Sequence, residues 1–180
     1  MKSIIEGERA LCFWLSQQTE VSLYHPDEKI KQAALDYVSL MTPVVKSLFT
    51  DLAMEITSDA MQIHGGYGYT KDQGIEQLYR DNRITPIYEG TNSVQAADLV
   101  FRKLSNKKGD VINKFLEMIK SECESKNEKV KTFSKELNHY LDILSKFTDW
   151  INDKNKIEKD DVSAAANDYL KSLGLSLIHI

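Results

Sequence analysis

The feature that most constrains the fold is a long run of apolar residues spaced three and four positions apart. Its members are Ile30, Ala34, Tyr37, Met41, Val44 and Leu48, followed by Leu52, Ile56, Ala60 and Ile63. This spacing gathers apolar side chains on one face of an α-helix. Pro43 lies inside the run and should kink a helix near Ser39 or Leu40. The run predicts either one long kinked helix or two helices that separate near Thr50 and Asp51.

Helical spacing also occurs on both sides of this run, and alternation typical of strands is sparse, so we expect an all-α fold. Inward positions include Val94, Ala97, Phe101 and Leu104 in one helix, and Tyr140 in another. The expected helices are Lys2–Gln18, Asp72–Arg80 with Asp72 as N-cap, Thr91 or Asn92 to Leu104, Val111–Ser125, Val130–Ile151 and Val162–Leu173, with an irregular segment at Ile84–Glu89 and a charged loop at Asn152–Asp161.

The chain is expected to divide at Ser105–Gly109, a polar segment that ends in glycine. Residues 1–104 form the first predicted domain, and residues 105–173 form a second, partial helical domain. Residues 174–180 are a short apolar tail, and whether this tail is native stays open. Both ends look cut, so we expect a piece of a longer chain.

Composition excludes some classes of protein. The net charge of the 180 residues is −4, which does not favour nucleic acid as a partner. No apolar run reaches the roughly 20 residues that a membrane span needs. Cys12 and Cys123 are far apart, which is typical of reduced thiols in a cytoplasmic protein and gives no metal site.

The segment Gln62–Gln95 is where we expect a site. It contains five of the eight glycines and separates long helical patterns. Within it, Glu89 stands between Tyr88 and Gly90, and a carboxylate held back from water by apolar neighbours suits a general base. Gly90 leaves room for a flat substrate. The alternative is an exposed glutamate at the start of a helix.

The glycine-rich stretch Gln62–Tyr69 also has two interpretations. In the first, Gly65–Gly66 is the C-cap that ends a helix. In the second, the glycine backbone approaches a diphosphate or a ring of a ligand, and Gln62 forms a hydrogen bond with a ligand oxygen. His64 has no partners at metal-ligand spacing, so no metal site is predicted. Arg80 is interpreted as a structural ion pair with Asp81 or Glu76.

Three motifs occur together in one order: QIHGGYGY at 62–69, RDNRI at 80–84 and IYEGTN at 87–92. This combination resembles the C-terminal all-helical domain of the acyl-CoA dehydrogenase family over at least residues 11–104. The segments HPD at 25–27, LMTPVVK at 40–46 and ADLVFRKL at 97–104 are similar to one branch, that of 3-methylmercaptopropionyl-CoA dehydrogenase. Members of that branch carry an extra helical domain, which residues 111–173 fit.

The resemblance implies an up-and-down helical bundle and an FAD-dependent oxidoreductase that dehydrogenates an acyl-CoA between its α and β carbons. Glu89 matches the catalytic base and Gly90 a substrate contact, while Thr91, Asn92 and Ser93 match flavin contacts. A further set matches the diphosphate or adenine side of FAD, often in a neighbouring subunit: Gln62, Ile63, His64, Gly65 and Gly66.

The resemblance also implies an electron-transfer flavoprotein as acceptor and a homodimer or homotetramer. The family's other domains are missing here, so we expect the chain alone not to turn over substrate. Two alternatives remain: a relative of the same fold that associates with DNA, and a helical module for oligomerisation. The net charge speaks against the first, and the intact YEGT glutamate speaks against the second.

Overall fold

The computed structural model describes residues 1–104, 109–123, 128–155 and 157–178, without the side chains of 109–110, 128–133 and 178. These residues contain helices and no strand, which confirms the all-α prediction. Most of the predicted hinge at 105–109, the turn at 126–128 and the side chains of Val130 and Phe133 lie outside the described residues. None of the described helices has the length and apolar character that crossing a bilayer requires.

The described residues form seven α-helices, with a π-helical turn at Leu99–Lys103 and two short 3-10 turns at Gly65–Tyr69 and Lys71–Gln73. They are α1 (Lys2–Tyr24), α2 (Glu28–Ile63), α3 (Ile75–Asn82), α4 (Asn92–Asp98), α5 (Gly109–Cys123), α6 (Glu128–Lys154) and α7 (Lys159–Ile178).

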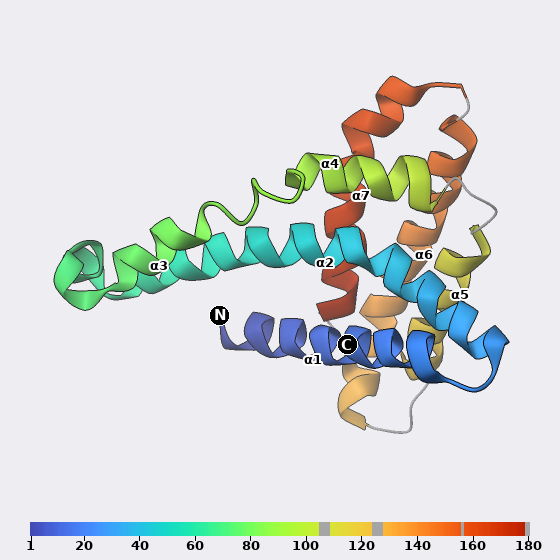
Figure 1. Cartoon of the computed structure of the whole chain (residues 1–180), viewed down its shortest axis with the longest axis horizontal. Helices are drawn as coiled ribbons and strands as arrows, with labels where there is room; N and C mark the ends of the chain where they lie inside the picture. The colour runs from blue at the N-terminus through green and yellow to red at the C-terminus, as the bar shows by residue number, and fades with distance from the viewer. Residues whose placement is uncertain (105–108, 124–127, 156, 179–180) are drawn as a thin grey trace.

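Helix α2 is continuous through Thr50 and Asp51, so the prediction of a single long helix is confirmed. Asp27 caps its start, because the carboxylate accepts a hydrogen bond of 2.8 Å from the Lys29 backbone N–H. Pro43 lies inside the helix, and Figure 1 shows that α2 changes direction along its course. Its length places its two ends in different parts of the molecule.

The chain forms a packed body and a projecting arm (Figure 1). The body contains α1, the first half of α2, α4 and the three later helices. The arm consists of the second half of α2, on which the two 3-10 turns and α3 fold back. After α3 the chain returns from the arm to the body and begins α4, so the arm carries the motif at 62–69 and the body carries the start of α4.

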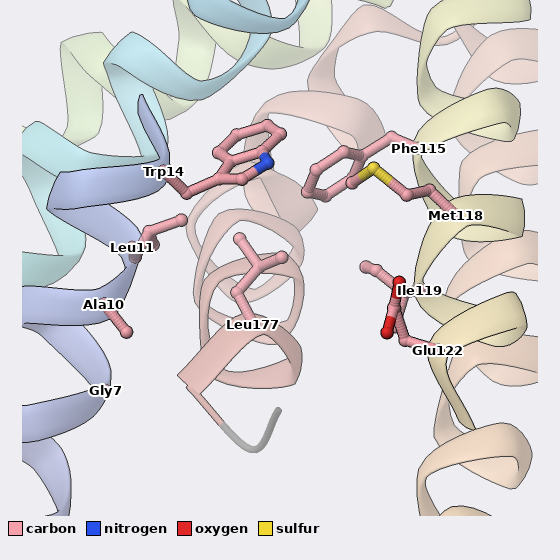
Figure 2. Close-up of a pocket in the computed structure, with 9 residues that line it drawn as sticks. All are labelled: Gly7, Ala10, Leu11, Trp14, Phe115, Met118, Ile119, Glu122 and Leu177. Carbon is pink, nitrogen blue, oxygen red and sulfur yellow. The ribbon is translucent and has the colours of Figure 1, made fainter. Parts of the chain in front are cut away.

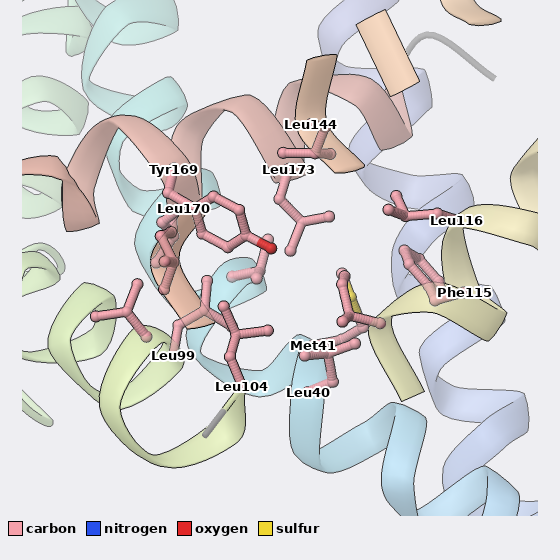
Figure 3. Close-up of a cluster of buried hydrophobic side chains, with 14 of the residues drawn as sticks. Leu40, Met41, Leu99, Leu104, Phe115, Leu116, Leu144, Tyr169, Leu170 and Leu173 are labelled. Atoms are coloured by element: carbon pink, nitrogen blue, oxygen red, sulfur yellow. The ribbon is translucent and has the colours of Figure 1, made fainter. Parts of the chain in front are cut away.

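One hydrophobic core joins helices from both sides of residue 105 (Figure 3). It includes Met41 and Val44 of α2, Leu99 and Leu104 after α4, and members of α5, α6 and α7: Ile112, Phe115, Leu116, Ile119, Leu141, Leu144, Ile151, Val162, Ala166, Tyr169, Leu170 and Leu173. The division of the chain into two domains at residue 105 stays a prediction.

Some inward positions and helix limits were predicted wrongly. Tyr140 is 61% exposed and Val94 is 57% exposed, whereas Leu141 and Ala96 are buried. Helix α1 continues to Tyr24 rather than Gln18, and within this extension Thr19 Oγ1 donates to the Leu15 carbonyl at 2.9 Å.

The ends of the last helices also differ from the prediction. Helix α6 runs to Lys154 and α7 begins at Lys159, so most of the predicted charged loop is helical. Helix α7 continues to Ile178, and its first turn contains Asp160 and Asp161, where the helix dipole favours acidic residues. The start of the predicted apolar tail, Gly174, is therefore a buried part of α7.

Candidate functional site

The glycine-rich stretch forms the tip of the arm. Helix α2 ends at Ile63, with His64 as its C-cap, and Gly65 has a left-handed backbone with φ of 60°. The side chains of Gln62, Ile63 and His64 are exposed, as are Gly65 and Gly66. Gly65 therefore follows the C-cap in the left-handed conformation that often ends a helix, in agreement with the first interpretation. The exposed backbone beside it leaves the second interpretation open as well.

The three glycines of this stretch serve different purposes. Gly68 is buried, and a Cβ atom there would lie 2.5 Å from the Met61 carbonyl oxygen and 2.9 Å from the His64 Cβ. A Cβ on Gly66 would meet nothing within 4 Å. Packing therefore requires glycine at 68, backbone conformation favours it at 65, and neither explains it at 66.

Helix α3 separates this tip from the IYEGTN motif at 87–92. It begins at Ile75 after Gly74, whose φ is 70°, so the prediction of Asp72 as N-cap was wrong. Asp72 instead lies in the 3-10 turn that precedes Gly74. Arg80 Nε lies 3.9 Å from Glu76 Oε2 on the same helix, in agreement with a structural ion pair.

Glu89 and Gly90 form a left-handed turn immediately before α4. Glu89 has φ of 56° and is the one non-glycine residue with positive φ in the described chain, while Gly90 has φ of 82°. A left-handed backbone costs a residue with a Cβ roughly 1–2 kcal/mol. Backbone strain of this kind is concentrated at functional sites, so the turn marks Glu89 independently of its sequence motif.

Hydrogen bonds hold this turn on both sides. The Gln95 side-chain amide donates to the Glu89 carbonyl at 2.9 Å, and Lys46 Nζ donates to the Gly90 carbonyl at 2.7 Å. A Cβ on Gly90 would lie only 3.2 Å from Gln95 Nε2. The turn is thus hydrogen-bonded both to α4, which it precedes, and to α2.

Asn92 fastens the start of α4 to α2. Its Nδ2 donates to Asp51 Oδ1 at 2.7 Å and to the Ser47 carbonyl at 3.2 Å. Its Oδ1 accepts from Lys46 Nζ at 2.9 Å and lies 3.2 Å from Thr50 Oγ1. An amide offers two N–H donors and one carbonyl, so these contacts occupy the side chain. The backbone N–H of Asn92 donates to the Pro86 carbonyl at 3.3 Å.

The neighbouring motif residues are arranged differently. Thr91 is the N-cap of α4, because its Oγ1 accepts a hydrogen bond from the Val94 N–H at 3.4 Å, which decides between the two predicted positions, Thr91 and Asn92. Ser93 is exposed, with its Oγ 3.5 Å from Asn167 Nδ2 of α7. Glu89 itself is exposed, so the described residues do not supply the apolar enclosure expected around its carboxylate.

Large apolar side chains are exposed along the returning segment and the start of α4. They are Ile84 at 55%, Ile87 at 47%, Tyr88 at 50% and Val94 at 57% exposed. An apolar surface of this kind, next to the strained backbone of Glu89, is typical of a surface that a ligand or a further part of a protein covers.

Two apolar grooves lie elsewhere. One, of about 380 Å³, is lined by α1, α5 and α7, with Trp14, Phe115 and Leu177 around it (Figure 2). The other, of about 440 Å³, lies between α6 and α7. Neither is lined by any residue of the 62–95 segment, so the candidate site is an exposed surface and is separate from these two grooves.

Sequence reasoning missed the part of the site that α2 contributes. Lys46, Thr50 and Asp51 hold Asn92 and the turn from the opposite side. A signal was present, because Lys46 and Thr50 stand four positions apart within an apolar helix and so share one face. Among the described residues, no group of three or more His, Cys, Asp or Glu side chains could hold a metal ion.

Comparisons with known proteins agree with this fold. The profile of the acyl-CoA dehydrogenase C-terminal domain matches residues 22–104. The chain is 39% identical over 119 residues to 3-methylmercaptopropionyl-CoA dehydrogenase of Ruegeria pomeroyi, covering 66% of this chain and 20% of that protein. It is 33% identical over 115 residues to a butyryl-CoA dehydrogenase of Syntrophomonas wolfei, covering 64% and 19%.

The same fold occurs in a solved structure. The crystal structure of Caenorhabditis elegans ACDH-11 in complex with C11-CoA matches with a TM-score of 0.81 and 24% identity, over 99% of this chain and 31% of that one. The shared fold therefore includes the helices on both sides of residue 105. The chain spans about a fifth of the length of the two curated relatives. Residues 22–104 thus match the C-terminal domain of the acyl-CoA dehydrogenase family.

Proposed function

We propose that this chain is part of an enzyme that dehydrogenates an acyl-CoA thioester, with Glu89 as the base that removes the α-proton. The observation that carries the proposal is the strained turn at Glu89–Gly90, fixed by Gln95 and Lys46. A base for a weakly acidic C–H must be held in place, and a rigid backbone restricts where the carboxylate can go.

In this reaction the Cα–H and Cβ–H bonds of the substrate break and a carbon–carbon double bond forms. The proton goes to the Glu89 carboxylate, and FAD, when bound, supplies the acceptor for the β-hydrogen and its electron pair. Gly90 carries no side chain that would obstruct a substrate beside Glu89. The exposed Ile87 and Tyr88 would be covered, and Glu89 shielded from water, by further parts of the enzyme.

The residues proposed to hold FAD lie at two places. Thr91, Asn92 and Ser93 are at the start of α4, whereas Gln62, Ile63, His64, Gly65 and Gly66 are at the tip of the arm (Figure 1). Because the arm projects away from α4, the tip would serve the cofactor of a neighbouring subunit. This supports a homodimer or homotetramer rather than a single subunit as the functional unit.

The chemistry of the tip favours one part of FAD. The residues from Gln62 to Gly66 include no lysine or arginine, and they stand at the C-terminal end of α2, where the helix dipole disfavours an anion. The Gln62 amide and the open backbone at Gly66 fit a neutral, hydrogen-bonding ring better than a diphosphate. We therefore place the adenine side of FAD at the tip.

The remaining assignments extend this proposal. An electron-transfer flavoprotein would accept the electrons, the location would be the cytoplasm, and the chain by itself would not turn over substrate. The relatives differ in the substrates that their names print, from 3-methylmercaptopropionyl-CoA to butyryl-CoA, so the acyl group is proposed only as a class.

The test compares the full-length enzyme that contains this chain with its Glu89→Gln variant. We expect bound flavin in both, and a loss of about 10³-fold in flavin reduction by acyl-CoA in the variant, in the range that removal of a general base produces. Glu55→Gln, at an exposed position of α2, is the control and should retain wild-type rates. Equal rates for Glu89→Gln and wild type would refute the assignment of the base.

A further inference from the structure

Lys46 lies on α2 with its ammonium group between two parts of the segment that carries Glu89. Nζ donates to the Gly90 carbonyl at 2.7 Å and to the Asn92 Oδ1 at 2.9 Å. These contacts span 44 and 46 residues of sequence. The lysine is half-buried, so its position is restricted by the surrounding helix as well as by these two bonds.

The two carbonyls that follow the Glu89 Cα atom are held from opposite sides. Gln95 of α4 binds the carbonyl of Glu89, and Lys46 of α2 binds the carbonyl of Gly90. Each carbonyl belongs to one peptide plane, so together the two bonds fix both planes after the Glu89 Cα atom. A hydrogen bond from a charged donor is stronger than one between neutral groups, which makes Lys46 the firmer of the two restraints.

The second contact of Lys46 extends this restraint to α4. The Asn92 amide lies between the Lys46 ammonium group and the Asp51 carboxylate, with its oxygen toward the cation and its Nδ2 2.7 Å from Asp51 Oδ1. The dipole of the amide is thus aligned between a positive and a negative group, which stabilises this orientation. Helix α2 thereby fixes the residues that follow Glu89 as well as the turn itself.

We propose that Lys46 is a positioning residue for the dehydrogenation, acting through the Glu89–Gly90 turn without touching substrate. This inference rests on the proposed function of Glu89. The lysine holds the strained backbone in the left-handed conformation and so sets where the Glu89 carboxylate stands relative to the α-carbon. Loss of the cation would leave flavin and substrate bound while the base loses its alignment.

The test uses the full-length holoenzyme and the variant Lys46→Met, which keeps an apolar stem and removes the donor. We expect the rate constant of flavin reduction at saturating acyl-CoA to fall by about 10–100-fold, the effect of misplacing a catalytic group by about 1 Å. The apparent Kd for acyl-CoA should change by less than about threefold, and amide hydrogen exchange over residues 86–95 should accelerate at least about tenfold.

Lys103→Met is the matched control. Lys103 Nζ also binds α2, through Ser39 Oγ at 2.9 Å, but it does not contact the turn. This variant should keep wild-type flavin reduction and exchange over residues 86–95. Lys46→Arg, which keeps a charged donor, should restore at least part of the rate. If Lys46→Met fails to fold, Lys46→Gln, with a shorter neutral donor, takes its place in both measurements.

The two proposals fail in different ways. Unchanged exchange over residues 86–95 in Lys46→Met overturns the inference whatever the rate, and faster exchange with an unchanged rate overturns the role in positioning. A wild-type holoenzyme that no acyl-CoA reduces overturns the proposed function, and with it the catalytic part of the inference. In that case the exchange measurement still decides whether Lys46 holds the turn.

Discussion

Asn155 donates a hydrogen bond of 2.9 Å from Nδ2 to the carbonyl of Val100, 55 residues earlier in the chain. Val100 lies in the π-helical turn after α4, and Asn155 follows the end of α6. Both residues are buried. The bond therefore satisfies a backbone carbonyl in the core and ties the end of the α4 segment to α6.

Replacing Asn155 by alanine should destabilise the fold. The variant leaves the buried Val100 carbonyl without this donor, which costs about 1–3 kcal/mol of unfolding free energy. Urea denaturation of the chain and the variant measures the difference. Asn152→Ala, one turn earlier on α6 and only half-buried, is the control and should cost less than about 0.5 kcal/mol. Equal losses in the two variants would show that the Val100 contact contributes nothing specific.

The same π-helical turn explains why one buried face was predicted wrongly. Apolar spacing of three and four assigned Val94 to the core, but the buried residues are Ala96, Leu99, Val100 and Leu104. Between Leu99 and Leu104 the backbone hydrogen bond spans five residues, so the turn rotates the helix faces relative to a regular α-helix. Periodicity predicted that a helix exists here and could not predict its phase.

Some features of the candidate site depend on residues close in sequence, and others depend on contacts between residues far apart in sequence. The Thr91 cap and the glycine at the end of α2 were predictable, because each depends on residues within a few positions of itself. The contacts of Lys46 with Gly90 and Asn92 were not, because a helix spacing says which residues share a face and not what that face meets. The positive φ of Glu89 was likewise hidden from a sequence pattern.

Tyr169 gives a prediction about alkaline pH. Burial raises the pKa of its phenol well above the ordinary value, although the Thr148 hydroxyl 2.8 Å away lowers it in part. The folded chain therefore holds this proton more tightly than the unfolded chain, whose tyrosines ionise near about pH 10. The stabilising contribution is complete below that pH and is lost as pH rises through and above it.

Tyr169→Phe should therefore remove part of the alkaline loss of stability. Urea denaturation at about pH 8 and pH 10.5 measures the fall in unfolding free energy for each protein, and the fall should be smaller in the variant than in wild type. Tyr140→Phe, at a residue that is 61% exposed, should leave the fall unchanged. The prediction is wrong if Tyr169→Phe and wild type lose the same free energy over this interval.

Gly174, the first residue of the predicted apolar tail, is expected to be needed for the packing of α7 against α2. A Cβ atom at this position would lie 2.7 Å from Leu48 Cδ2 and 3.2 Å from Val44 Cγ1, both on α2. Leu48 is buried, so its side chain has little room to move. Gly174→Ala should lower the unfolding free energy by about 1–3 kcal/mol through overpacking.

Thermal or urea unfolding compares this variant with Ser172→Ala, on an exposed position of the same helix. The control should be neutral, because alanine favours helix and Ser172 is not in the core. A gain of stability in Gly174→Ala, as expected for a glycine replaced in an open helix, would mean that α7 does not pack against α2 at this point.

Two glycines of the arm tip are expected to differ in their role, because Gly68 is required by packing and Gly66 is not. Gly68→Ala should disrupt the tip, because its Cβ would lie 2.5 Å from the Met61 carbonyl oxygen, which belongs to the backbone and cannot rotate away. Hydrogen exchange over residues 60–70 should accelerate in this variant. Gly66→Ala should leave exchange unchanged, since a Cβ there meets nothing within 4 Å and its φ is not positive.

Gly66 therefore tests the cofactor part of the proposed function without disturbing the fold. If an FAD ring approaches the bare backbone of the tip, a methyl group at 66 lies in its way. Gly66→Ala in the full-length enzyme should then weaken FAD binding about tenfold, which corresponds to about 1.4 kcal/mol, while its melting temperature without FAD equals that of wild type. Fluorescence titration of the flavin-free protein with FAD measures the affinity. An unchanged affinity in Gly66→Ala would show that FAD does not bind at Gly66. A melting temperature without FAD that is lower than that of wild type would show that this glycine has a structural role.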